Sequence, residues 1–99
     1  MAKIESTLSV SSTEFTQNSE AMLASVAEFR NVEQKVVDKE NDAKEKFVKR
    51  GKLLPRERIN LLLDRGAPFL EISSLAGFKM HDDKDGSMAG GGIIAGIGY

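Results

Sequence analysis

The last nine residues read Gly91-Gly92-Ile93-Ile94-Ala95-Gly96-Ile97-Gly98-Tyr99. From residue 93 onward, every second position carries isoleucine, alanine or tyrosine, and the positions between them carry Ile94 and two glycines. A period of two is typical of a β-strand, and glycine within a strand lets another group approach closely. The pattern therefore predicts a strand over residues 93–99.

A strand needs a pairing partner, and one other candidate stands upstream. Pro68 disfavours helix at the residue before it, and the run Phe69–Ile72 reads as a short strand. The polar residues 79–88, which include Gly86, predict a loop. Because a lone two-stranded ribbon is marginal in water, we expect residues 93–99 to open a larger sheet whose remaining strands are missing from a truncated chain.

Two helices are predicted before the strands. One apolar stripe recurs every seven residues: Met22, Phe29, Val36 and Ala43. This spacing predicts a long helix from Phe15 to near Arg50, where Gly51 supplies a left-handed cap. A second helix is predicted from Pro55, whose fixed φ suits a first turn, to Gly66. Its expected buried stripe is Ile59, Leu62 and Leu63.

Length and composition indicate a small soluble protein with a thin core, since so short a chain buries only about 60% of its unfolded surface. The 99 residues are 40% hydrophobic and 29% charged. No aliphatic run approaches the roughly 20 residues that a bilayer span needs, which excludes a membrane protein. The absence of cysteine excludes a disulfide framework and a thiolate zinc site. A net charge of -1 does not favour nucleic acid as a partner.

The chain divides into three predicted parts. Residues 1–14, rich in serine and threonine, are expected to form a disordered leader. Residues 15–66 form the helical segment, and residues 67–99 begin the sheet. Residues 1–33 carry five acids and two bases, a balance unlike that of a transit peptide, so we expect a cytoplasmic protein.

Two short motifs resemble binding loops but lack required parts. Gly90–Gly92 is not followed by the lysine of a phosphate loop, and its strand comes after the glycines rather than before them. Residues 81–92 match a calcium loop in part, but the first and twelfth places hold His81 and Gly92. We interpret the first as a turn feeding a tightly packed strand and the second as a solvated turn.

One segment is strongly basic. Residues 44–58 hold seven bases and two acids, a local excess of +5. A solvated helix face with a favourable C-terminal dipole is one interpretation. The other is a site for a phosphorylated ligand or an acidic partner, for which Arg50 and Lys52 are the phosphate-contact candidates. Phe47 is the one aromatic residue in the segment, which disfavours nucleic acid further.

Several runs resemble the amino-terminal region of the carboxyltransferase (β) subunits of biotin-dependent acyl-CoA carboxylases. They are Arg50 to Ile59, Leu62-Leu63-Asp64, Gly66, Pro68 to Glu71, Leu75-Ala76-Gly77 and Gly91 to Gly98. The helix before them is similar too, at Phe15, Asn18, Ala21-Met22-Leu23, Val26 and Arg30. Leu54-Pro55 favours the methylcrotonoyl-CoA branch, since propionyl-type relatives usually carry Thr-Ala there. A threonine would cap the helix, so Leu54 forgoes about 1 kcal/mol and is expected to pack in a hydrophobic staple instead.

The resemblance implies an α/β fold: the amino-terminal fragment of a crotonase-like (ClpP/crotonase) domain, with two helices followed by its first short strands. It implies carboxylate transfer from carboxybiotin to the γ carbon of 3-methylcrotonoyl-CoA, as in leucine degradation. Backbone amides in such enzymes stabilise the enolate. The glycine turns that supply those amides lie downstream, so we expect no catalytic, cofactor-binding or metal-binding residue in these 99 residues.

The implied partners are an acyl-CoA, a biotin carboxylase and biotin carrier α subunit that holds the biotin, and further β subunits in a homo-oligomer. We expect this chain to be inactive alone. The propionyl-CoA and geranyl-CoA branches stay open, because the pocket residues that set acyl specificity are absent here. A different class also stays open, a helical module that binds a protein partner, although an unpaired strand at residues 93–99 argues against it.

Overall fold

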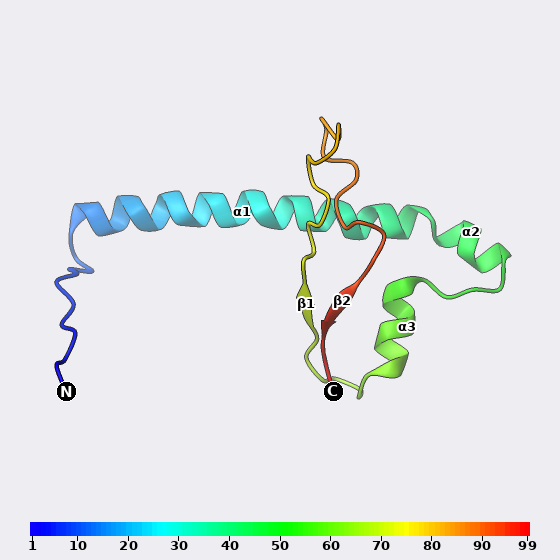
Figure 1. The fold of residues 1–99 in the computed structure, drawn as a ribbon, viewed down its shortest axis with the longest axis horizontal. Coiled ribbons are helices and arrows are strands. Elements are labelled where there is room, and N and C mark those ends of the chain that lie inside the picture. Colours follow the sequence, from blue (N-terminus) through cyan, green and yellow to red (C-terminus); the bar gives the residue numbers. More distant parts are fainter. The chain divides into compact units, whose positions relative to one another are not determined.

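The computed structural model describes residues 1–99, which divide into two units, residues 1–30 and residues 31–99. The elements in order are α1 (Thr13–Asp42), α2 (Lys44–Lys49), α3 (Pro55–Leu62), β1 (Leu70–Ile72) and β2 (Ala95–Ile97) (Figure 1). Helix α1 has residues in both units. None of the helices combines the length and apolarity that crossing a membrane requires.

In the first unit, α1 begins at Thr13, two residues before the predicted start. Ser12 caps the helix, because the amide of Phe15 donates a hydrogen bond of 3.1 Å to its Oγ atom. Residues 1–9 have no regular structure. Met22 and the other apolar side chains of α1 in this unit are exposed or half-buried, so this part of the stripe has no covering layer.

The second unit breaks the long helix that the sequence predicted, so the prediction of one helix to Arg50 was wrong. At the break, the Ala43 amide donates to the Glu40 carbonyl, three residues back, at 3.1 Å. This tighter turn ends α1, and α2 restarts at residue 44 in a new direction (Figure 1). The predicted cap at Gly51 is confirmed, with φ of +65° and its amide bonded to the Val48 carbonyl.

Helix α3 starts at Pro55 as predicted but ends at Leu62, a turn earlier than expected, because Leu63 adopts an extended backbone. Leu54 is its N-cap and is only 4% exposed, the one buried hydrophobic side chain of the chain. The amide of Leu54 donates to Glu57 Oε2 at 3.0 Å. The predicted buried stripe was wrong at Leu62, which is 84% exposed on the last turn of this short helix.

Strands β1 and β2 pair antiparallel, with Leu70 opposite Ile97 and Ile72 opposite Ala95, so the predicted pairing is confirmed. Both strands are three residues long, shorter than the predicted runs. The amide of Asp64 also bonds the Tyr99 carbonyl at 2.7 Å, which ties the end of the ribbon to the segment after α3. No third strand joins them, so each keeps one unpaired edge.

Candidate functional site

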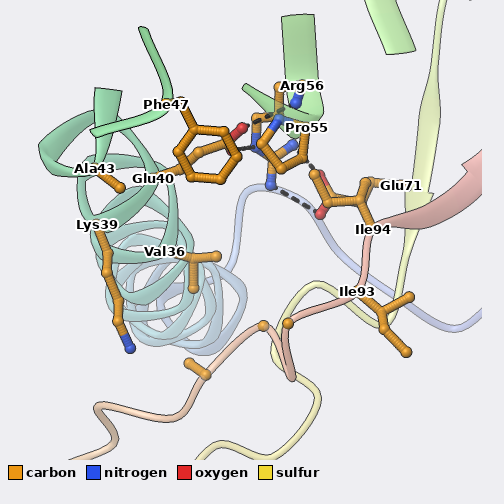
Figure 2. Close-up of a pocket in the computed structure, with 13 residues that line it drawn as sticks. Val36, Lys39, Glu40, Ala43, Phe47, Pro55, Arg56, Glu71, Ile93 and Ile94 are labelled. Atoms are coloured by element: carbon orange, nitrogen blue, oxygen red, sulfur yellow. Dashed lines mark hydrogen bonds and ion pairs between the residues drawn. The ribbon is translucent and has the colours of Figure 1, made fainter. Parts of the chain in front are cut away.

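The densest polar cluster of the second unit joins three elements. Arg56 of α3 lies between Glu71 of β1 and Glu40 of α1 (Figure 2). Its Nη1 and Nη2 atoms donate to Glu71 Oε2 and Oε1 at 2.6 and 2.9 Å, a bidentate pair. Its Nε atom forms an ion pair with Glu40 Oε2 at 3.0 Å, without hydrogen-bond geometry. The backbone amide of Arg56 donates to Glu40 Oε1 at 2.9 Å.

The electrostatics of this cluster favour a permanently charged arginine. The hydrogen bonds that Arg56 donates to Glu71 raise the pKa of Arg56 above its ordinary value, and the charges of both carboxylates add to the rise. Partial burial acts in the opposite direction and lowers it. Glu40 also satisfies a first-turn amide of α3, where a negative charge suits the helix dipole. The cluster therefore fixes α1, α3 and β1 to one another.

A cavity of about 280 Å³ lies beside the cluster. Its lining consists of Val36, Lys39, Glu40, Ala43, Phe47, Pro55, Arg56, Glu71, Ala89, Gly90, Gly92, Ile93 and Ile94 (Figure 2). Most of these side chains are apolar. Of the two cations, Arg56 is held by carboxylates and Lys39 donates to the Ser87 carbonyl at 2.6 Å. The cavity is largely apolar, and Lys39 is the lining cation without a carboxylate partner.

The phosphate-contact candidates Arg50 and Lys52 lie elsewhere, on the exposed turn between α2 and α3, outside the cavity lining. Two bases of the basic segment are paired, Arg56 with its glutamates and Lys44 with Glu57 at 3.9 Å. The other five are exposed: Lys46, Lys49, Arg50, Lys52 and Arg58. The basic excess is thus spread over an open surface.

Sequence reasoning missed the role of Arg56, which it counted with the other bases of the segment. The signal was Glu71, a single charge within the apolar run Phe69–Ile72. A carboxylate on the inner side of a strand needs a cationic partner, because burying an unpaired charge is costly. That partner is Arg56, which lies within the basic stretch Lys44–Arg58.

The polar loop is more ordered than the predicted solvated turn, and for Asp83 that prediction was wrong. Asp83 is 7% exposed, and its carboxylate accepts from the Lys79 amide at 2.9 Å and from the Ser87 hydroxyl and Met88 amide at 3.2 Å each. Hydrogen bonds from Ser87, backbone first, lower the pKa of the exposed Asp85. No group of three acidic or histidine side chains is placed to hold a metal ion.

The glycines of this region form turns and close contacts, as predicted. Gly90, Gly91 and Gly92 all have positive φ angles. A Cβ atom on Gly90 would lie 2.9 Å from Val36 Cγ1, so the loop needs glycine to approach α1 this closely.

Comparison with known proteins identifies the family. Residues 46–99 match the Carboxyl transferase domain. The probable methylcrotonoyl-CoA carboxylase beta chain of Drosophila melanogaster is 43% identical over 88 residues, 88% of this chain and 15% of that protein. The 3-methylcrotonyl-coenzyme A carboxylase beta1 subunit of Mycobacterium tuberculosis is 54% identical over 56 residues, 57% of this chain and 10% of that protein.

A solved structure agrees with these matches. The beta subunit of Pseudomonas aeruginosa geranyl-CoA carboxylase aligns with a TM-score of 0.79 and 64% identity, covering 97% of this chain and 17% of that one. The chain therefore spans about a sixth or less of the length of these relatives. Because the domain match covers more than half of its residues, the chain belongs to the carboxyl transferase domain family.

Proposed function

We propose that this chain forms part of the carboxyltransferase (β) subunit of a biotin-dependent acyl-CoA carboxylase. The reaction is carboxylate transfer from carboxybiotin to the γ carbon of 3-methylcrotonoyl-CoA, within a crotonase-like fold. The observation that carries the proposal is the domain match over residues 46–99, together with 43% identity over 88 residues to the Drosophila protein of that name. The acyl-CoA, an α subunit that carries biotin and further β copies are the proposed partners.

Residues 1–99 contribute architecture rather than chemistry in this proposal. The guanidinium of Arg56 is committed to Glu71 and Glu40, so it is not offered to the carboxylate of carboxybiotin or to a CoA phosphate. The exposed Arg50 and Lys52 remain proposed phosphate contacts at the turn before α3. A cytoplasmic location is also proposed, supported by the acidic balance of residues 1–33.

A second candidate substrate is geranoyl-CoA. It is favoured by the 64% identity over 97% of this chain to the P. aeruginosa geranyl-CoA carboxylase subunit, against 43% and 54% for the two methylcrotonoyl-type relatives. The reaction type and the partners are the same, so the two candidates differ only in the acyl group.

Two chimeras test the function and separate the candidates. Residues 1–99 replace the matched region of the P. aeruginosa geranyl-CoA carboxylase β subunit in the first chimera. In the second, the 56 residues of this chain that match the M. tuberculosis beta1 subunit replace their counterpart there. Each chimera is assayed with its own α subunit for ATP-dependent carboxylation of its own acyl-CoA. A functional segment retains at least about a tenth of the parent kcat/KM, a barrier change within ~1.4 kcal/mol.

The smaller loss of kcat/KM marks the branch whose subunit the segment fits better. That is the M. tuberculosis background for the methylcrotonoyl branch and the P. aeruginosa background for the geranyl branch. Each parent with its own segment deleted and then restored is the control. Soluble but inactive chimeras in both backgrounds, beside active restored controls, would contradict the proposed function and favour a helical interaction module.

A further inference from the structure

The cavity of the second unit has apolar walls and charged groups at two ends. Its apolar lining is supplied by Val36, Ala43, Phe47, Pro55, Ile93 and Ile94. Figure 2 shows Arg56 beside Glu71 at one end of this lining and the ammonium of Lys39 at the other. A molecule in the cavity therefore meets a different charged group at each end.

The Lys39 end has free capacity for an anion. An ammonium carries three hydrogen-bond donors, and one of these goes to the Ser87 carbonyl oxygen at 2.6 Å. No carboxylate pairs with Lys39, so two donors remain. The side chain is exposed, which leaves it open to a ligand arriving from solvent. A carboxylate suits this end best, because it accepts charge-assisted hydrogen bonds from an ammonium.

The Arg56 end directs an anion away from itself. The guanidinium is held by Glu71 and Glu40, so two negative charges surround one positive charge. The net charge of -1 at that end repels a carboxylate, and the ammonium at the other end attracts it. An aliphatic carboxylate would thus lie in one direction, with its charge at Lys39 and its chain along the apolar lining.

The volume of the cavity limits the length of that chain. At about 30 Å³ for each water-sized group, the cavity of about 280 Å³ has room for roughly nine such groups. With the carboxylate at the exposed end, a chain of about eight carbons fills this space. A chain twice as long would leave half of its methylenes in water.

We propose that this cavity binds a medium-chain aliphatic carboxylate, held by the ammonium of Lys39 and by apolar contacts with Val36, Ala43 and Phe47. The inference goes beyond the proposed function and does not depend on it, because it rests only on residues of this chain. The ligand would contact α1 and the glycine turn before β2 together, since Lys39 and Gly90 both line the cavity.

Calorimetric titration of the P. aeruginosa chimera with sodium octanoate tests the proposal. We expect saturable binding, with an affinity that rises about fourfold for each methylene from butanoate to octanoate. From octanoate to hexadecanoate the affinity should rise no further, because the added carbons stay outside the cavity. Octan-1-ol has the same chain without the charge and should bind at least tenfold more weakly than octanoate.

Three variants test the two ends of the contact. Lys39→Gln should weaken octanoate binding at least tenfold. Lys35→Gln is the matched control, since Lys35 is an exposed lysine one turn earlier on α1 and outside the cavity lining, and it should change nothing. Ala43→Leu fills part of the cavity and should weaken octanoate binding more than butanoate binding.

Amine labelling locates the bound ligand. Octanoate should slow the reaction of Lys39, and not of Lys35, with acetic anhydride, as read by peptide mass spectrometry. Octanoyl-CoA carries the same chain without a free carboxylate and should leave Lys39 unprotected. The proposal is overturned by the absence of saturable octanoate binding, by unprotected Lys39, or by equal affinity for octan-1-ol. An affinity that keeps rising to hexadecanoate, or that ignores Lys39→Gln, overturns it as well.

Discussion

Arg56 and Glu71 face each other through two parallel hydrogen bonds, 2.6 Å from Nη1 to Oε2 and 2.9 Å from Nη2 to Oε1. The pair crosses from the first turn of α3 to the middle of β1, 15 residues apart in sequence. The pair sets which face of the ribbon turns toward the helices. Because side chains alternate along a strand, Leu70 and Ile72 must then point to the opposite face.

Arg56→Lys is expected to loosen this attachment. Lysine keeps the charge but cannot make the bidentate pair, and the loss of a hydrogen bond between charged groups costs about 1.5–3 kcal/mol. In the P. aeruginosa chimera, hydrogen exchange of the peptides over α3 and β1 should quicken about tenfold or more. Lys46→Gln, which removes an exposed base without a carboxylate partner, is the control and should change nothing. Equal exchange in both variants would contradict a structural role for the pair.

Gly96→Ala and Gly98→Ala should differ in severity. A Cβ on Gly96 would lie 2.6 Å from the Leu70 carbonyl oxygen, a backbone atom of the paired strand that cannot move aside. A Cβ on Gly98 would meet side chains rather than backbone: the flexible end of Leu63 at 2.8 Å and the Phe69 ring at 3.3 Å. The first change should abolish exchange protection across β1 and β2 in the chimera, and the second should weaken it partly. The reverse order would show that the strands pair differently.

Asp83→Asn should open the polar loop. The carboxylate accepts from Lys79 at Oδ2 and from Ser87 and Met88 at Oδ1, and the amide that replaces it has one acceptor oxygen, so the donors on one side lose their partner at about 1–3 kcal/mol each. Either the Lys79 amide or the Met88 amide should lose protection from exchange in the chimera, according to which side the asparagine oxygen takes. Asp82→Asn is the matched control, since Asp82 is exposed and asparagine tolerates its φ of +69°. Loss of exchange protection in Asp82→Asn alone would contradict the claim that Asp83 orders the loop.

The loop should also respond to acid through Asp85. Hydrogen bonds from Ser87 favour the ionised carboxylate, so the folded pKa lies below the unfolded value of about 3.9. A depressed carboxyl pKa means that the contribution to loop order is present above the unfolded pKa and is lost as pH falls through the folded pKa. A carbon-13 titration of the Asp85 carboxyl should place its midpoint below that of a model peptide. Ser87→Ala removes the hydroxyl but keeps the backbone amide, the larger cause, so it should raise the midpoint only in part. An unchanged midpoint in that variant would contradict a contribution from the hydroxyl.

The sequence predicted the ribbon because the patterns that define it involve only neighbouring residues. The alternation after Gly92, the strand-like run before residue 73 and the cap at Gly51 each depend on neighbours within a few positions. All three are present in the structure. The family resemblance is likewise confirmed by the match over residues 46–99.

The features that the sequence did not reveal depend on distant partners. The break at Ala43 leaves Glu40 on the last turns of α1, where it meets the amide of Arg56, 16 residues away. Helical periodicity carries no information about such a contact, so the pattern continued the helix to Arg50. The burial of Asp83 was missed for the same reason, because its donors are set by the turns of the loop rather than by spacing.

We propose that the second unit is one part of a larger layered fold, because Leu54 is its one buried hydrophobic side chain. Thermal unfolding of the isolated 99-residue chain, followed by circular dichroism on a sample checked by sedimentation, tests this most directly. We predict a broad, non-cooperative transition and self-association through exposed apolar side chains. A monodisperse monomer that unfolds in one sharp cooperative transition would contradict the claim.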